Sequence, residues 1–282
     1  MFDWGSRTYV MGILNATPDS FSGDGLLSRE DAVDAALRQA KSFLDAGVDI
    51  LDIGGESTRP GARPVNAEEE RERVIPILRA IHKAFPNAFL SVDTSKAEVA
   101  AVALDAGARM VNDVWGFRAD ARMAEVAAQR EAFVVLMHNR SQPAHAEIRE
   151  RLGGRYVGME YENLLDDVRR ELMESVALAH AAGVPDEKII LDPGVGFGKT
   201  VEQNLTLLNH LDEIKALGYP VLIGTSRKSF IGYTLDLPPE ERLEGTAATV
   251  TLGIVRGADI VRVHDVEAMT RVARMTDALL RA

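Results

Sequence analysis

The segment DPGVGFGKT, Asp192 to Thr200, has the residue types that could hold a phosphate group, because three glycines precede a lysine and a threonine. A P-loop requires four residues between its first glycine and the Gly-Lys-Ser/Thr ending, so that backbone N–H groups surround the phosphates. Only three residues separate Gly194 from Gly198. Moving the first glycine back by one position would require it at Pro193, which has no N–H to donate. Nucleotide binding is therefore a weak interpretation, and the rest of the chain must indicate what the segment binds.

Polar side chains follow eight short apolar runs, each at the carboxyl end of its run. They are Asn15; Asp52 and Glu56; Asp93; Asn112 and Asp113; His138; Asp192; Thr225, Ser226, Arg227 and Lys228; and Arg262, His264 and Asp265. A carboxylate buried in such a position costs several kcal/mol unless a donor, a cation or a ligand pairs with it. Asp52 and Asp265 are expected to form structural ion pairs. That explanation does not extend to all eight run ends, so the pattern predicts a functional site.

The runs that carry these residues predict parallel strands. They are YVMGIL, DILDIG, FLSVDT, RMVNDV, FVVLMH, KIILDP, PVLIGT and DIVRVH, and most of their residues are apolar, as in strands buried on both faces. Amphipathic helical patterns alternate with the runs, for example over residues 28–47, 66–85, 94–107 and 163–183. The chain thus predicts repeated strand and helix units.

We expect these units to form one domain, residues 1–282, with the α/β fold of a closed (β/α)8 TIM barrel. A doubly wound open sheet would alternate in the same way, but a Gly-rich first turn is missing and eight units favour the barrel. In a barrel the carboxyl ends of all strands meet at one rim, where active sites lie. The barrel would bring the polar run ends to a single place.

Three connecting segments near this rim are long. ATPDSFSGDGLLS, residues 16–28, follows the first run, and GESTRPGARPVN, residues 55–66, follows the second. Long loops rich in turn residues usually bind or cover a ligand, so we expect that role for both. RSQPAHAEIRERLGGRYVG, residues 140–158, is a third candidate for that role, but its lower specificity favours a plain solvated connector.

Composition limits the classes of partner. The 282 residues include no cysteine, which excludes disulfides, thiolate nucleophiles and cysteine-ligated zinc. A formal net charge of -11 disfavours a surface that coats nucleic acid. We find no targeting segment and no apolar stretch of membrane-spanning length, so a cytoplasmic protein without nucleic-acid or membrane partners is expected.

Eight motifs in order resemble those of the dihydropteroate synthases, the pterin-binding folate-pathway family that sulfonamides inhibit. They are MGILNATPDSFSGDG, DIGGESTRPGA, SVDT, NDVWG, LMHNR, DPGVGFGKT, GTSRKSFIG and RVHDV, and they extend from Met11 to Asp265. One departure is the order Ser22-Gly23-Asp24-Gly25, where the family usually has the aspartate directly after the serine; a role for Asp24 is therefore in doubt. The resemblance implies a transferase that condenses (7,8-dihydropterin-6-yl)methyl diphosphate with 4-aminobenzoate, and a homodimer formed through the helices of the last units.

The resemblance also implies the site residues. For pterin diphosphate they are Thr58, Asp93, Asn112, Met137, Asp192, Lys228, Arg262, Val263 and His264. For 4-aminobenzoate they are Thr58, Arg59, Pro60, Phe197, Gly198, Lys228 and Ser229, with Lys199 at the edge and Asp19 and Phe21 closing over the ligand. Catalytic roles fall to Lys228, Arg262 and His264, and Asn15 matches the ligand of a Mg²⁺ cofactor.

These residue types suit the implied chemistry. Carboxylates and amides accept hydrogen bonds from the N–H edge of a pterin, and arginine and histidine can hold a departing diphosphate. We expect the C–O bond to break largely before the amine attacks, so no protein nucleophile is needed. Arg262→Ala is accordingly expected to weaken diphosphate binding far more than pterin binding.

Two alternatives use other chemistry. A catalytically silent pterin-binding paralogue could keep the fold without the reaction. A pterin-dependent methyltransferase has a similar barrel, but it would lack the TRPG loop and the cations of SRKS and RVH, all of which this chain contains.

Overall fold

The computed structural model describes residues 2–16, 29–58, 61–142, 145–149, 151–156 and 159–282. Eight parallel strands form one sheet in the order β8-β5-β4-β3-β2-β1-β10-β9. Their bounds are β1 Tyr9–Asn15, β2 Ile50–Gly54, β3 Phe89–Asp93, β4 Met110–Asp113, β5 Phe133–Met137, β8 Ile189–Asp192, β9 Leu222–Ile223 and β10 Ile260–Val263. A parallel bridge between Leu191 and Val221 joins the two edges. The expected TIM barrel is confirmed, and each strand lies within one of the eight apolar runs or ends one residue beyond it.

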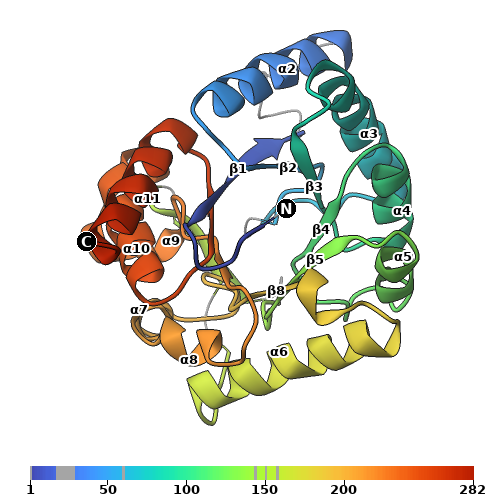
Figure 1. Cartoon of the computed structure of the whole chain (residues 1–282). Coiled ribbons are helices and arrows are strands. Elements are labelled where there is room, and N and C mark those ends of the chain that lie inside the picture. The colour runs from blue at the N-terminus through green and yellow to red at the C-terminus, as the bar shows by residue number, and fades with distance from the viewer. Residues whose placement is uncertain (1, 17–28, 59–60, 143–144, 150, 157–158) are drawn as a thin grey trace.

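Helices surround the barrel as an outer ring (Figure 1). Their bounds are α2 Arg29–Asp45, α3 Ala67–Ala84, α4 Ala97–Asp105, α5 Met123–Gln129, α6 Leu164–Ala181, α7 Val201–Asn209, α8 Leu211–Lys215, α9 Ser229–Leu235, α10 Leu243–Val255 and α11 Val266–Leu280, with short 3-10 turns at Asp186–Lys188 and Pro239–Glu241. Within the described part of the chain, no helix combines the length and the apolar character that crossing a membrane requires.

Side-chain caps fix where several helices begin. Asn66 accepts a hydrogen bond from the Glu69 N–H at 2.9 Å before α3. At α7, the Thr200 hydroxyl accepts from the Gln203 N–H, and the Gln203 side chain accepts from the Thr200 N–H. Such caps typically contribute about 1 kcal/mol each, because they pair N–H groups that the helix leaves unbonded. The capping box starts α7 directly after the DPGVGFGKT segment.

Aromatic side chains close the amino end of the barrel. Phe2 stacks on Trp4 at a centroid distance of 4.7 Å and meets Tyr9, Phe89 and Phe133 at 5.0, 4.9 and 5.4 Å. The last three residues lie at the amino ends of β1, β3 and β5. The N-terminal segment, which contributes Phe2 and Trp4, crosses the centre of the barrel in the view of Figure 1. Ligands must therefore reach the interior from the carboxyl end.

An antiparallel hairpin lies in the connection after β5. Its strands are β6 Ala146–Arg149 and β7 Gly153–Tyr156, paired from Ala146 with Tyr156 to Arg149 with Gly153. The expectation of a plain solvated connector over 140–158 is wrong. The hairpin has little apolar alternation, and cross-strand ion pairs such as Glu147 with Arg155 support it instead.

Candidate active site

Strand register brings a polar layer to the carboxyl end of the barrel interior. Alternate residues of a strand face opposite sides, so residues two positions apart share a face. The apolar interior layer contains Met11, Ile50, Met110, Val135, Ile190 and Ile260. Two residues beyond Ile50, Met110, Val135, Ile190 and Ile260 lie Asp52, Asn112, Met137, Asp192 and Arg262. The register pairs Asp93 with Asn112 and Met137 with Asp192 on adjacent strands. Five residues implied for the pterin diphosphate thus share one end of the barrel.

Val263 is oriented differently from its neighbour Arg262. It belongs to the core cluster between the sheet and the helices, where it is buried. Its side chain therefore packs on helices and does not face the barrel interior. Any contact between Val263 and a ligand would have to use its backbone.

Arg262 lies at the centre of the polar layer. Its Nε donates to Asp52 Oδ2 at 2.7 Å, and its Nη2 donates to Asp93 Oδ2 at 2.6 Å. Asn112 Nδ2 donates to the same Asp52 oxygen at 3.0 Å. Asp52 is completely buried, and its second oxygen has no hydrogen-bond partner among the described residues. The expectation that Asp52 forms a structural ion pair is confirmed, and its partner is a predicted site residue.

Burial and ion pairing oppose each other in this layer. Burial raises the pKa of Asp93 to about 7, although Arg262 counteracts the rise. Burial also raises the pKa of Asp192 to about 6, against the hydrogen bond from the Gly194 N–H and the charges of Lys228 and Arg262. Burial alone would lower the pKa of Arg262, but Asp52 and Asp93 raise it, so the guanidinium stays charged. The layer holds carboxyl groups that titrate near neutral pH beside a permanent cation.

The DPGVGFGKT segment turns tightly against the loop after β5. Asp192 accepts from the Gly194 N–H at 2.7 Å. Gly194 has φ +71°, and a Cβ there would lie 1.8 Å from the carbonyl oxygen of His138. Gly198 has φ +64°, and a Cβ would lie 2.6 Å from the carbonyl carbon of Arg140. Only glycine allows this close approach, so these glycines serve backbone packing.

Lys199, the lysine that suggested a P-loop, points inward. It is 3% exposed, and its Nζ lies 3.0 Å from Gly194 O, 3.1 Å from Phe197 O and 3.0 Å from His138 Nδ1. Burial lowers the pKa of Lys199 to about 7. The ammonium group therefore holds the turn together from inside the protein. That Lys199 edges the 4-aminobenzoate site stays a prediction.

His138 is buried with Lys199. Its Nε2 lies 3.1 Å from Glu171 Oε2. Burial, with a contribution from Lys199, lowers the pKa of His138 to about 4, so the ring is neutral at pH 7. Glu171 also accepts hydrogen bonds from Arg140. Through its contacts with Lys199 and Glu171, His138 therefore stabilises the carboxyl end of β5.

A small apolar cluster lies beside the polar layer. It contains Val114, Met137 and Phe197, with Trp115 and Tyr156 packed against them. The Lys228 Nζ lies 3.9 Å from the centroid of the Phe197 ring, a cation–π contact. Lys228 precedes Ser229, the first residue of α9. The structure thus brings Phe197, Lys228 and Met137 together, with Ser229 adjacent in the chain.

His264 and Asp265 follow directly after β10. His264 receives support from Ser226, whose Oγ lies 3.1 Å from both its backbone nitrogen and its Nδ1. Asp265 accepts from Arg227 at 2.9 and 2.5 Å. The expectation of a structural ion pair at Asp265 is confirmed. His264 lies two residues from Arg262, at the same strand end.

The second loop is held at both ends. Glu56 Oε1 accepts from the Val65 N–H at 2.9 Å, and Lys96 bridges Glu56 and Glu70 at 2.5 Å each. Thr58 lies between these anchors and is exposed. Its carbonyl accepts from the Tyr156 hydroxyl at 3.2 Å. Tyr156 is a candidate that the sequence analysis missed, because its only signal was one aromatic residue in a charged segment.

Several expected site residues lie outside the described residues. They are Arg59 and Pro60 of the second loop and Asp19, Phe21 and the segment 22–25 of the first.

Asn15 ends β1 and is half-buried, with Gly54 as its register partner on β2. Across the described ranges, no group of three or more His, Cys, Asp or Glu side chains is arranged to hold a metal ion. A cation at Asn15 would therefore take most of its ligands from water and substrate, which suits Mg²⁺ and its preference for oxygen.

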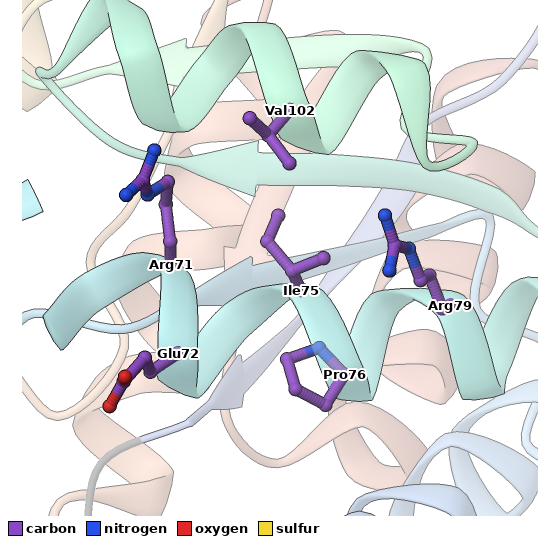
Figure 2. A pocket seen from close by; sticks show the side chains of 6 residues that line it. All are labelled: Arg71, Glu72, Ile75, Pro76, Arg79 and Val102. Carbon is purple, nitrogen blue, oxygen red and sulfur yellow. The ribbon is translucent and has the colours of Figure 1, made fainter. Parts of the chain in front are cut away.

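A hollow of about 410 Å³ lies elsewhere, lined by side chains of α3 and α4 (Figure 2). It is lined by Arg71, Glu72, Ile75, Pro76, Arg79 and Val102. None of these residues follows a strand, and no predicted site residue lines the hollow. The rim of the barrel remains the candidate active site.

Comparison with known proteins identifies the family. Residues 11–264 match the family model described as pterin binding enzyme. The chain is 51% identical to a dihydropteroate synthase of Clostridium beijerinckii, over 99% of this chain and 97% of that protein. A Clostridium difficile dihydropteroate synthase crystallised in the presence of pteroic acid superposes with a TM-score of 0.90, at 48% identity and full coverage of both chains. A Xanthomonas albilineans dihydropteroate synthase with 4-aminobenzoic acid gives 0.87, at 39% identity over 98% of this chain and 94% of that one.

Proposed function

Since the chain belongs to the pterin-binding enzyme family, among the dihydropteroate synthases, we propose that it condenses (7,8-dihydropterin-6-yl)methyl diphosphate with 4-aminobenzoate. The products are 7,8-dihydropteroate and diphosphate. The observation that carries the proposal is the polar layer, in which Arg262 contacts Asp52 and Asp93 beside Asn112 and Asp192. Its acceptors and its cation match the two ends of a pterin diphosphate.

The pterin binds to the acceptors of the layer. Asp93, Asn112 and Asp192 are the acceptors available for the N–H edge of the heterocycle, and Met137 beside Asp192 packs on its face. Each charge-assisted hydrogen bond contributes about 1.5–3 kcal/mol. Because the layer excludes most water, these bonds are stronger than on an exposed surface.

The diphosphate binds to the cations. Arg262 and His264 lie at the end of β10, and Lys228 lies at the start of α9 after β9, where barrels commonly bind phosphate. The C–O bond breaks with its electron pair leaving on the diphosphate, the amine nitrogen forms the new C–N bond, and one amine proton is released. Arg262, His264 and Lys228 stabilise the leaving anion, and the carboxylates stabilise the positive charge on the pterin methylene.

4-Aminobenzoate binds toward the second loop. Phe197, Gly198, Lys228, Ser229 and Thr58 form this end of the site, with Arg59 and Pro60 assigned to it from sequence alone. The Phe197 ring and the Lys228 ammonium are already in contact, which suits a ligand that has an aromatic ring and a carboxylate.

Mg²⁺ is the proposed cofactor, held by Asn15. When bound, it would neutralise charge on the diphosphate. The fit rests on the side-chain oxygen of Asn15 at the end of β1. Asn15 pairs in register with Gly54 on β2, and Gly54 pairs with Asp93 on β3.

The test is incubation of the purified protein with the pterin diphosphate, labelled 4-aminobenzoate and Mg²⁺. Dihydropteroate should form, and omission of the pterin diphosphate should abolish it. Folded protein that binds the pterin without forming product would instead identify a silent paralogue. Methyl transfer from a reduced folate would identify a methyltransferase.

The assembly is proposed to be a homodimer formed through the last helices. Val255 on α10 and Met275, Leu279 and Leu280 on α11 are between 52% and 65% exposed. Large apolar side chains on neighbouring helices make an apolar face that water covers poorly. A second copy of the chain, contributing the same face, would remove it from water.

A further inference from the structure

We infer that Tyr156 on the hairpin β6–β7 forms a wall of the 4-aminobenzoate end of the site and sets the affinity for that substrate. The inference rests on the proposed function, which it deepens by one residue. It concerns the segment 140–158, which the sequence analysis favoured as a solvated connector.

Tyr156 joins two elements of the site that are far apart in the chain. Its hydroxyl donates to the carbonyl of Thr58 at 3.2 Å. Its ring lies 6.3 Å from the Phe197 ring, centroid to centroid, with 26° between the planes. Lys228 contacts Phe197 at 3.9 Å. The chain of contacts therefore runs from Thr58 through Tyr156 and Phe197 to Lys228.

The Tyr156 hydroxyl is protonated at neutral pH. Burial raises the pKa of Tyr156 above its ordinary value, against a smaller effect of a hydrogen bond with Ser141. The phenol is thus protonated at neutral pH and can donate to Thr58.

The hairpin is anchored on the side away from the second loop. Arg242, which is buried, donates to the carbonyl of Leu152 at 2.8 Å, in the turn between β6 and β7. Arg155 lies over the ring of Tyr233 on α9 at 4.3 Å. Arg151 donates to the carbonyl of Asp236 at 2.7 Å. These contacts fix the hairpin to the segment from α9 to α10.

The other side of the hairpin meets the second loop. A Cβ at Gly61 would lie 2.7 Å from Cδ1 of Ile148, on β6. With the Tyr156 contact to Thr58, the loop touches both strands of the hairpin. The hairpin therefore bridges two sides of the barrel mouth, and Tyr156 is held between fixed partners.

The aromatic wall matches one of the two substrates. A planar aryl amine packs favourably on aromatic rings, which contribute about 0.5–1.5 kcal/mol beyond the buried area. The acceptors for the pterin lie in the barrel interior on β3, β4 and β8. Tyr156, whose named contacts are with Phe197 and Thr58, is therefore expected to act chiefly on the aminobenzoate.

The test compares Tyr156→Phe and Tyr156→Ala with the wild type. Tyr156→Phe keeps the ring and loses the hydroxyl's hydrogen bonds with Thr58 and Ser141, so the KM for 4-aminobenzoate should rise about threefold. Tyr156→Ala also loses the ring, and the rise should reach about tenfold or more. The KM for pterin diphosphate should stay within about twofold in both. Tyr219→Phe is the matched control, because it loses a tyrosine hydroxyl bond to Asp186 just before β9, outside the proposed site, and should change neither KM.

A purely structural role of Tyr156 would lower the stability of the variants or raise both KM values together. Circular dichroism and urea denaturation establish that each variant is folded. An equal rise in both KM values, or an unchanged KM for 4-aminobenzoate in Tyr156→Ala, would overturn the inference.

Equilibrium binding separates this inference from the proposed function. Labelled 4-aminobenzoate is titrated into each protein in the presence of Mg²⁺ and inorganic diphosphate. If the wild type forms no product but Tyr156→Ala still binds 4-aminobenzoate more weakly than the wild type, only the proposed function is refuted. If the wild type forms product and Tyr156→Ala has the same affinity and KM for 4-aminobenzoate, only the role of Tyr156 is refuted.

Discussion

The Nη2 of Arg262 donates to Asp93 Oδ2 at 2.6 Å, so the cation proposed for the diphosphate directly contacts a carboxylate proposed for the pterin. The sequence suggested two separate sides of the site, one anionic and one cationic. In the structure they meet at this pair, with Asp52 as the second carboxylate of the same guanidinium. The two halves of the substrate are therefore expected to depend on one another.

Replacing Arg262 by alanine should weaken binding of both diphosphate and pterin. Without the guanidinium, the pKa of Asp93 rises further and the protonated carboxyl accepts hydrogen bonds less well. Buried Asp52 also loses its partner, so the free energy of unfolding should fall by about 3–5 kcal/mol. Urea denaturation and calorimetric binding measure these changes. Arg227→Ala, which breaks the partly exposed pair with Asp265, should cost only about 0–1 kcal/mol. Loss of diphosphate affinity alone would restore the simpler division of the site.

Asp192→Asn should stabilise the protein at high pH while reducing pterin affinity. The folded pKa of Asp192, about 6, lies above its unfolded value, so the ionised carboxylate is penalised above pH 6 and the penalty vanishes below about pH 4. The free energy of unfolding of the variant should therefore exceed that of the wild type by about 1–3 kcal/mol at pH 8 and equal it at pH 4. Pterin affinity should fall about tenfold or more. Denaturation at several pH values checks the first effect. A difference in the free energy of unfolding between variant and wild type that does not depend on pH would contradict it.

Gly194→Ala should destabilise the fold more than a matched glycine. The added Cβ would clash with the His138 carbonyl oxygen at 1.8 Å, and φ is +71°. Gly218 has φ +92° but nothing within 4 Å of a Cβ, so Gly218→Ala carries only the backbone cost of about 1–2 kcal/mol. The difference between the two variants in thermal denaturation isolates the close approach. Equal losses would show that the loop after β5 can move away.

Asn15→Ala should raise the Mg²⁺ concentration needed for half-maximal activity by about tenfold, because one oxygen ligand is lost. Binding of the pterin without Mg²⁺ should not change. A Mg²⁺ titration of the initial rate gives the first quantity, and calorimetry gives the second. An unaltered titration would place the metal elsewhere.

Leu279→Asp on α11 should convert the proposed dimer into monomers. A charge at the centre of an apolar interface costs several kcal/mol unless it is paired. Light scattering coupled to gel filtration reports the mass. Leu178→Asp on α6, another exposed apolar residue, should leave the mass unchanged. A wild type of monomer mass would end the dimer proposal.

The strands were predictable from sequence because burial on both faces forces a continuous apolar run. For the same reason the polar residue that ends each run stands out, and so Asp93, Asn112 and Asp192 could be found. Pairing across the barrel could not be predicted, since Arg262 and Asp93 are far apart in the chain. The inward turn of Lys199 depends on carbonyl groups, which leave no trace in the sequence. The hairpin escaped because ion pairs, and not apolar alternation, support it.

The aromatic cluster at the amino end of the barrel determines how ligands enter and leave. Because Phe2, Trp4 and their neighbours close that end, both reactants and both products must pass through the carboxyl end of the barrel. Asp192 is buried in the interior, whereas Thr58 is exposed near the opening. In the proposed arrangement the heterocycle binds deeper than the amine, so we expect it to bind first and to be covered by the amine.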